Sequence, residues 1–212
     1  MNKNILIVLC LVLFFSCTKD VTSLSDVYSN DFEQGDLKGI TGGIVTTYNN
    51  SKVLGQYNNG GFELSVADLP KHDLVEVTFD LYIHDSWDGN QNIDNIDGPD
   101  IWKLILDGKE YINTTFSNST CGVGMHCSPQ SYPNDYPNFN NNPKTGAFQI
   151  NLPTVCHTVG KTTLYKIKKR ISHSKSSILI KCIDKLVQTN ANDPLCDESW
   201  SVDNINVKTI SL

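Results

Sequence analysis

The sequence has little that would commit the protein to nucleic acid, to zinc or to a membrane-spanning helix. Its 212 residues carry 17 Lys and Arg against 23 Asp and Glu, and a chain with a net charge of −6 is repelled by phosphate backbones. No two of its seven cysteines have the Cys-x-x-Cys spacing of structural zinc sites. The longest apolar run, Ile5 to Phe15, has eleven residues, whereas a membrane-spanning helix needs about 20.

Recognisable catalytic motifs are also missing. The chain has no Gly-x-Ser-x-Gly nucleophile motif, and its five histidines are scattered along the sequence. The paired carboxylates of glycosidases stand about 5 to 9 Å apart. Glu76 and Asp80 share one face of an expected strand, but their spacing places them about 13 Å apart along it. We therefore predict that the protein is not an enzyme.

The N-terminal segment has the pattern of an export signal. Lys3 precedes the apolar run, and Ser16-Cys17 follows it. This order resembles a bacterial lipoprotein signal, in which a small residue precedes the cysteine that becomes lipidated, although Phe14 stands where the usual motif has Leu. The alternative is ordinary signal-peptide cleavage near this cysteine, without a lipid.

The lipoprotein interpretation sets the expected domain boundaries. We predict a signal peptide over 1–16, a lipidated Cys17 with a polar tether that together cover 17–30, and one folded domain over 31–212. Acyl chains on Cys17 would attach the protein to a membrane without a transmembrane span. We expect the cell envelope as its location, on the outer membrane, with exposure at the cell surface left open.

The expected domain has the sequence pattern of β structure. Apolar and polar residues alternate strictly from Leu74 to His84, as in a strand with one buried face. Asp107-Gly108 separates two further apolar runs and is a hairpin signal. About nine such runs occur, separated by polar turns, and no long stretch has apolar residues at the spacing of a helix. The pattern predicts an all-β domain, built as a two-sheet antiparallel β-sandwich.

One long segment breaks the alternation. Residues 117–145 have no periodicity, and a loop of this length inside a compact domain is usually functional or disordered. Its aromatic residues stand among Pro and Asn, and aromatic faces stack on sugar rings or on partner side chains. We predict ligand binding by Tyr132, Tyr136 and Phe139, together with Trp87. The alternative is that the loop rings plug an open edge of the sandwich. Trp102 and Trp200 are expected in the core.

The cysteines indicate two disulfides in an oxidising compartment. Besides Cys17, the exported chain would keep five cysteines, so one thiol remains free. Cys121 and Cys127 enclose a short glycine-bearing loop, and we predict that they pair. Cys196 would then pair with Cys156 or Cys182, and the sequence does not choose between them.

The loop over residues 84–100 is crowded with aspartates. Carboxylate and amide oxygens at this density are typical of calcium sites, because the ion needs six to eight oxygen ligands. Without a cation the carboxylates would repel one another and their pKa values would rise. We predict one calcium ion, with Asp85, Asp88 and Asp100 as first ligands and with Asn90, Asn92 and Asp94 as second choices. The alternative is a solvated acidic turn.

Three short motifs carry a resemblance to known domains. The opening "DFEQG", the loop "DSWDG…GPD" and the closing "DESWSVDNINV" resemble calcium-stabilised jelly-roll sandwiches, such as MAM-type domains, concanavalin A-like lectins and carbohydrate-binding modules. In these families the first and last strands lie side by side and often hold a structural ion. The resemblance therefore implies a jelly roll and places Asp31 or Glu33, and Asp203, near an ion.

Taken together, the sequence predicts a cell-envelope lipoprotein whose calcium-stabilised sandwich acts as a binding or adhesion module. A glycan is favoured over a surface protein as the partner, and nucleic acid is not expected. The alternatives are a structural component of the envelope and a polysaccharide-active enzyme with an unrecognised site.

Overall fold

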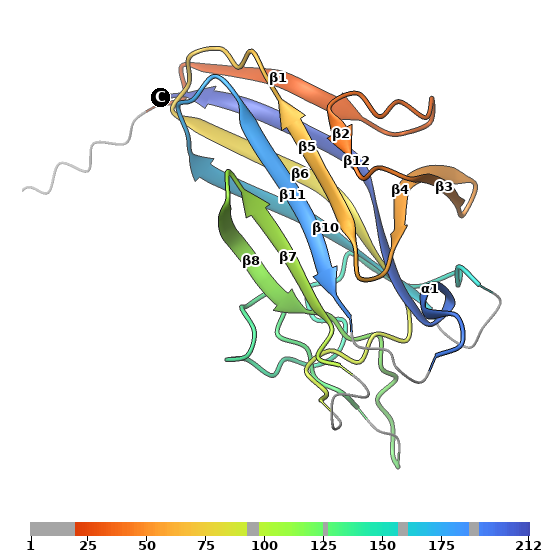
Figure 1. Cartoon of the computed structure of the whole chain (residues 1–212). Helices are drawn as coiled ribbons and strands as arrows, with labels where there is room; N and C mark the ends of the chain where they lie inside the picture. Colours follow the sequence, from red (N-terminus) through yellow and green to blue (C-terminus); the bar gives the residue numbers. More distant parts are fainter. Residues whose placement is uncertain (1–19, 93–97, 125–126, 157–160, 187–190) are drawn as a thin grey trace, which may run out of the picture.

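The computed structural model describes residues 20–92, 98–124, 127–156, 161–186 and 191–212. Within these ranges the chain forms twelve β-strands and one four-residue helix, α1, Pro194–Asp197 (Figure 1). None of the helical structure in the described ranges is long and apolar enough to cross a membrane. The strands, in chain order, are β1 Ser23–Asn30, β2 Ile40–Thr41, β3 Val45–Tyr48, β4 Ser51–Tyr57, β5 Gly61–Val66, β6 Leu74–Asp85, β7 Ile101–Leu106, β8 Lys109–Thr115, β9 Gln149–Leu152, β10 Thr162–Ser172, β11 Ile178–Lys185 and β12 Glu198–Ser211.

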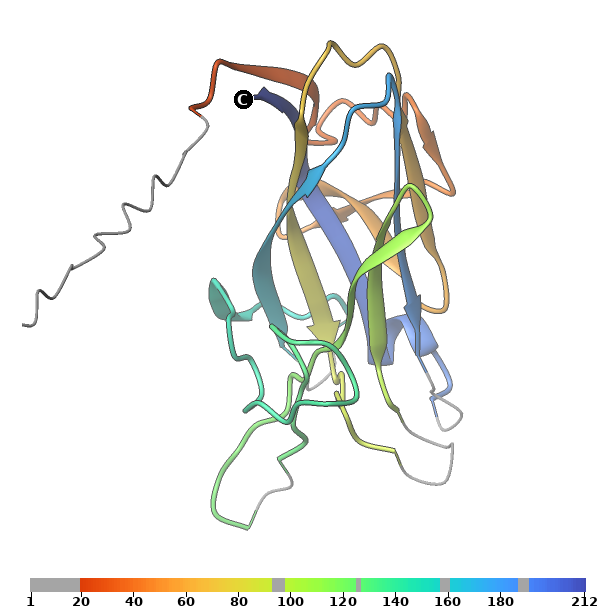
Figure 2. The ribbon, with the colours of Figure 1, turned by 90° about the vertical axis from the view of Figure 1, so that its left-hand side faces the viewer.

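The strands pair into two antiparallel sheets that pack face to face (Figure 2). The first sheet has the order β3-β4-β12-β6-β10-β9, with β1 also paired to β12. The second sheet has the order β2-β5-β11-β7-β8. The predicted two-sheet β-sandwich is therefore confirmed, with twelve strands in the described ranges where the sequence indicated about nine.

The path of the chain is that of a jelly roll. Successive strands pair in nested order: β4 with β12, β5 with β11 and β6 with β10. These pairs fall alternately in the first and the second sheet, so two folded-over halves of the chain wrap around one core. The inner β7–β8 hairpin turns at Asp107-Gly108, where both residues have the positive φ that such a turn requires.

Alternation along the strands builds the core. On β6, Val75, Val77, Phe79, Leu81 and Ile83 all point inward and are buried. The strand ends at Asp85, whose φ of 63° takes the backbone out of the extended region. The three tryptophans are wholly buried, which confirms the core prediction for two of them; they are Trp87, Trp102 and Trp200.

The domain begins earlier than the sequence predicted. We expected a tether up to residue 30, but residues 23–30 form β1, which pairs with β12 from Ser23 opposite Ser211 to Asn30 opposite Ile205. The strand was missed because it lies at an edge and most of its side chains are exposed or half-buried, so it has no apolar alternation. The pairing places the start of the described chain and the C-terminus together, at the end opposite the loops (Figure 1).

Two disulfides are present in the described ranges. Cys121 pairs with Cys127, which confirms the prediction, and Cys156 pairs with Cys196, which decides between the two partners that the sequence left open. Cys182 is a buried free thiol in β11, and burial raises its pKa. The predicted signal peptide and Cys17 lie outside the described residues.

Candidate functional site

The long segment over 117–145 is an ordered loop held by amide side chains. Gln130 is wholly buried, and its Oε1 accepts hydrogen bonds from the backbone amides of Ser117 and Lys144. Its Nε2 donates to the carbonyls of Tyr132 and Thr145. One neutral side chain thus satisfies four backbone groups of the loop, since an amide carries donors and acceptors together.

Two asparagines tie the loop to its surroundings in the same way. Asn118 Nδ2 donates to the carbonyls of Ile83 and Asp85, which fixes the start of the loop to the end of β6. Asn90 Nδ2 donates to the carbonyl of Phe139, and its Oδ1 accepts from two hydroxyls, those of Thr115 and Ser131. Asn90 was predicted as a second-choice calcium ligand, but the structure commits its amide to the loop.

The loop covers the outer edge of β8. The amide of Tyr132 donates to the carbonyl of Thr115, and the amide of Tyr136 donates to that of Asn113. An exposed edge strand is a template for unwanted pairing with other chains. The loop removes that template and places its own side chains beside the gap between β8 of the second sheet and β10 of the first.

A groove of about 350 Å³ lies along this covered edge, and we refer to it as the edge groove. Its walls come from β8, from β10 and from the loop between them. Aromatic, amide, carboxylate and ammonium groups all line it. The residues are Tyr111, Ile112, Tyr132, Pro133, Asn134, Asp135, Phe139, Ile167, Lys168 and Lys169.

The predicted ligand-binding aromatics divide between this groove and the core. Phe139 lines the groove and is 44% exposed, so its ring is open to a partner. Tyr132 also lines the groove but packs against Phe116 and Tyr165, with ring centroids 4.9 and 5.1 Å away. Burial raises the pKa of Tyr132. Tyr132 therefore plugs the edge, as the alternative interpretation proposed, while Phe139 does not.

The other two predicted aromatics do not line the groove. Tyr136 is half-buried and contributes a backbone hydrogen bond to β8. Trp87 was wrongly predicted as a ligand-binding residue: it is wholly buried, and its Nε1 donates to the carbonyl of Ser199 at 2.9 Å. Its position beside the acidic loop was read as exposure, but the ring packs between the sheets, with Phe116 as an edge-on neighbour.

Tyr111 and Lys169 were not predicted as groove residues from the sequence. Along β10 the inward positions hold Tyr165, Ile167 and Ile171, and Lys169 interrupts that apolar series. This interruption was the one available signal, because a lysine at an inward position must reach an opening of the sandwich. Tyr111 joins the groove only through the way the loop folds back on β8, which no local pattern encodes.

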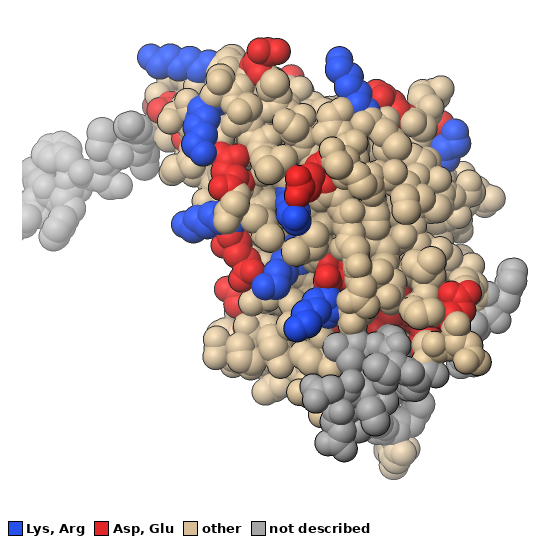
Figure 3. Space-filling view, viewed as in Figure 1, with Lys and Arg blue, Asp and Glu red and all other residues tan. Residues whose placement is uncertain are grey.

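Outward lysines of β10 are paired, in contrast to Lys169. Lys166 binds Asp80 at 2.9 Å, and Lys168 and Arg170 both bind Glu76, at 3.1 and 2.6 Å. These pairs follow directly from the β6–β10 register, in which Lys166 lies opposite Asp80 and Arg170 opposite Glu76. Figure 3 shows a similar interleaving of acidic and basic side chains on the β7–β8 side of the face it views.

The predicted calcium ligands of the 85–100 loop lie in different environments. Asp100 is wholly buried, and its Oδ2 accepts hydrogen bonds from the backbone amides of Asp88 and Gly89. Asp88 forms an isolated bridge with Ser117. Asn92 is exposed, and Asp94 lies outside the described residues.

Asp85 is the member of this set whose environment fits a cation. Its side chain is 2% exposed, and neither of its carboxylate oxygens accepts a hydrogen bond of normal geometry. Burial raises the pKa of Asp85 to about 6, a rise that the nearby amide of Val155 opposes and the charge of Asp197 reinforces. A buried carboxylate in this state is stabilised by a proton or by a bound cation.

The second predicted group of acids lies around a bulge in β12. Burial raises the pKa of Asp203 to about 6, and the charges of Asp80, Glu33 and Asp31 add to the rise. The structure thus places Asp203 within electrostatic range of both acids that the resemblance grouped with it, and adds Asp80. Across the described ranges, however, no three His, Cys, Asp or Glu side chains lie close enough together to hold a metal ion.

A second groove, of about 530 Å³, lies beside α1, on the other side of the sandwich end that carries the long loop. We refer to this end as the loop end and to the groove as the α1 groove. Ile44 and Leu195 are exposed apolar side chains on it, and three glycines contribute backbone to its wall. Gly61 is required there, because a Cβ at this position would lie 2.0 Å from the carbonyl oxygen of Cys182. Figure 3 shows a largely uncharged surface over β4, which borders this groove.

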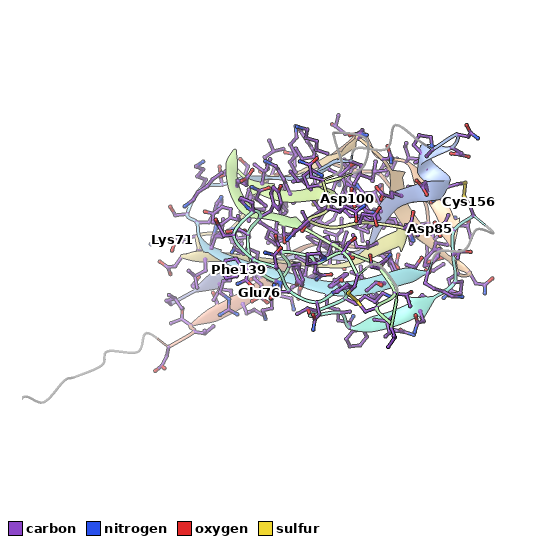
Figure 4. The ribbon with its side chains drawn as sticks, turned by 90° about the horizontal axis from the view of Figure 1, so that it is seen from below. Lys71, Glu76, Asp85, Asp100, Phe139 and Cys156 are labelled. Atoms are coloured by element: carbon purple, nitrogen blue, oxygen red, sulfur yellow. A yellow bond between two sulfur atoms is a disulfide. The ribbon has the colours of Figure 1, made fainter. Side chains whose placement is uncertain are left out.

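The two sides are separate in space. Figure 4 shows Phe139 well away from Asp85 and Cys156, which lie together near α1. A ligand in the edge groove therefore does not contact the buried carboxylate of Asp85.

No protein-family model matches the chain, and no curated protein matches it at a significant level. Among solved structures, the CBM22-2 xylan-binding domain from Paenibacillus barcinonensis Xyn10C is 13% identical over 86% of this chain and 99% of that one, with a TM-score of 0.39. The non-crystalline cellulose-specific module CBM28 is 16% identical over 86% and 92%, with a TM-score of 0.40. The K3 cleaved adhesin domain of Lys-gingipain from Porphyromonas gingivalis w83 is 9% identical over 87% and 100%, with a TM-score of 0.40. At these values the likeness carries no conclusion about a ligand.

Proposed function

We propose that the protein is a non-catalytic glycan-binding module and that the edge groove is its binding site. The observation that carries the proposal is the lining of the groove: the exposed ring of Phe139 stands beside the amide of Asn134 and the carboxylate of Asp135. A sugar ring offers an apolar face to an aromatic side chain and hydroxyls to polar groups at its rim. The groove volume is within the range of sites for small ligands.

Binding without catalysis is favoured by the carboxylates of the groove. Glycoside hydrolysis by the usual route needs two carboxyl groups that face each other across the bond. Asp135 is the one carboxylate among the residues that line the edge groove, and its Oδ1 already accepts a hydrogen bond from the amide of Asn113. A hydrolase site in the described ranges would have to lie elsewhere.

The proposal includes attachment to the cell envelope through a lipidated Cys17, on the outer membrane. The described chain enters the fold at the end opposite the loops, beside the C-terminus (Figure 1). An anchor at Cys17 would thus attach the end of the domain opposite the long loop, and this loop supplies one wall of the edge groove. Loss of the protein from membranes after Cys17→Ser would support this attachment, whereas a wild-type protein without a lipid would refute it.

The proposal also includes one structural calcium ion at the 85–100 loop, with Asp85 as a carboxylate ligand. The support for it is that Asp85 is buried and that its carboxylate oxygens accept no hydrogen bond of normal geometry. Carboxylate oxygens are preferred calcium ligands, and the ion would remove the cost of burying the charge. The ion would be remote from the glycan and would act on stability.

A binding panel tests the central part of the proposal. The purified protein is run in affinity gels that contain a range of polysaccharides, and the same polymers are assayed for cleavage products. We expect retardation by at least one polymer without cleavage. Phe139→Ala should abolish most of the retardation, whereas Phe148→Ala, which removes an even more exposed ring (63%) from outside the groove, should not. Cleavage of a polymer, or no retardation by any, would overturn the proposal.

A further inference from the structure

Two ammonium groups at the edge groove have no acidic partner in the described ranges: Lys169 lines the groove, and Lys109 contacts Tyr111, which lines it. Lys169 comes from an inward position of β10, and Lys109 comes from the start of β8. Neither forms an ion pair with any other residue in the ranges the structure describes. Two nearby lysines are paired, by contrast: Lys103 of β7 binds Glu110 at 2.7 Å, and Lys166 of β10 binds Asp80 at 2.9 Å.

Both ammonium groups gather at one aromatic ring. Lys109 Nζ lies 5.0 Å from the centroid of the Tyr111 ring, and Lys169 Nζ lies 5.6 Å from it. Tyr111 and Lys169 line the edge groove, so the charge of Lys169 stands at its wall and that of Lys109 lies next to the Tyr111 part of the wall. The ring holds the lysines in place by cation–π attraction but does not neutralise them.

The local charge is opposite to that of the whole protein. The whole chain has a net charge of −6. Among the residues that line this groove, however, Asp135 is the one carboxylate, and it already accepts a backbone hydrogen bond. Both ammonium groups lie close to one ring, at 5.0 and 5.6 Å from its centroid. An anion bound beside them offsets their positive charge and forms charge-assisted hydrogen bonds.

We propose that the edge groove selects anionic glycans, in which a carboxylate or sulfate group on the sugar binds between Lys109 and Lys169. This inference rests on the proposed glycan-binding function. The sugar ring lies on Phe139, and Asn134 and Asp135 remain for its hydroxyls. The chemistry is shared by uronic acids and sulfated sugars, which the experiment separates.

Matched polymer pairs test the inference, because each pair differs only in charge. Affinity is measured for polygalacturonate against its methyl ester and for dextran sulfate against dextran, in buffer of low ionic strength. We expect at least one charged polymer to bind about tenfold more tightly than its neutral partner. The preference should shrink as salt is added, since exposed charges are screened. The pair that shows the preference identifies carboxylate or sulfate.

Charge-matched variants give the decisive comparison. Lys109→Gln with Lys169→Gln should remove the preference for the charged polymer over its neutral partner. Lys103→Gln with Lys166→Gln changes the net charge equally but removes lysines that are already paired, and it should keep the preference. The inference would be overturned by equal affinities within both polymer pairs, or by an equal loss of the charge preference in both double variants. In either case, binding to the neutral polymers would still support the proposed function. Absence of binding to every polymer would overturn both.

Discussion

The two sides of the loop end bury polar side chains of different kinds. On the β8 side, the buried amide of Gln130 is neutral, and its hydrogen bonds satisfy backbone groups of the long loop. On the α1 side, the Cys156–Cys196 disulfide joins two segments next to the carboxylate of Asp85, whose oxygens lack hydrogen bonds of normal geometry. Both sides are ordered, but the carboxylate of Asp100, next to β7 and β8, accepts hydrogen bonds from backbone amides, whereas that of Asp85 does not.

The difference follows from what each side chain can offer. An amide donates and accepts, so it can close a polar interior without a counterion. A carboxylate only accepts, and without donors it needs a proton or a cation when it is buried. We therefore expect the β8 side to be insensitive to pH and metal ions and the α1 side to respond to both. The predictions below test this contrast, from the largest expected effect to the smallest.

The largest effect should come from the amide that organises the long loop. Gln130→Leu keeps the bulk of the side chain but leaves the amide of Ser117 and the carbonyl of Thr145 without their partner. The amide of Lys144 and the carbonyl of Tyr132 keep the carbonyl of Ser117 and the side-chain amide of Asn141 as partners. Each buried group left unsatisfied costs about 1–3 kcal/mol, so we expect a loss on the order of 4 kcal/mol in the free energy of unfolding. Urea denaturation measures it.

A surface glutamine provides the control for this loss. Gln149 is exposed, and Gln149→Leu should change the free energy of unfolding by less than about 0.5 kcal/mol. Chelators and pH should leave the effect of Gln130→Leu unchanged. If Gln130→Leu were as mild as the control, the amide would not hold the loop.

The second prediction concerns the pH dependence of the α1 side in calcium-free buffer. The folded pKa of Asp85 is raised to about 6 from an ordinary value of 3.8, so the folded state binds the proton more tightly than the unfolded state does. The stability that Asp85 contributes is complete below pH about 4 and is lost as the pH rises through about 6, by at most about 3 kcal/mol.

The comparison of wild type with Asp85→Asn isolates the pH-dependent contribution of Asp85 to the free energy of unfolding. Unfolding free energies of the two proteins, measured from pH 4 to pH 7, should move apart in favour of the variant as the pH rises. A difference that stayed constant across this range would show that Asp85 titrates normally.

The third prediction concerns removal of calcium. An ion that binds only the folded protein stabilises it by about 2.7 kcal/mol when its concentration exceeds Kd a hundredfold. At this chain length each kcal/mol corresponds to roughly 2–4 °C, so chelation should lower Tm by several degrees. Asp85→Asn should abolish the response, and Asp68→Asn, at an exposed position, should keep it. An unchanged melting curve in chelator, with no heat of calcium binding, would remove the ion from the account.

Sequence reasoning recovered what local patterns encode. The alternation from Leu74 to His84 located β6, and the Asp107-Gly108 dipeptide located the β7–β8 hairpin. The short spacing of Cys121 and Cys127 identified their disulfide. Each of these features depends on residues close together in the chain.

Features that depend on distant segments were missed. β1 is an exposed edge strand that is defined by its pairing with β12, and nothing in its own sequence shows that partner. Trp87 is buried because the long loop and β12 enclose it, although its neighbours in sequence are polar. The edge groove combines β8, β10 and the loop, so Lys169 and Tyr111 could not be grouped before the fold was known.

The most direct test of the central claim asks which side of the loop end binds the glycan. Phe139 in the edge groove and Leu195 in the α1 groove are almost equally exposed, at 44% and 42%, so their alanine variants are matched. Calorimetric titration of the tightest-binding polysaccharide should show about tenfold weaker affinity for Phe139→Ala, since an aromatic contact contributes on the order of 1 kcal/mol beyond its buried area. Leu195→Ala should bind as the wild type does. Weakened binding in Leu195→Ala, with Phe139→Ala unaffected, would place the glycan in the α1 groove and contradict the account.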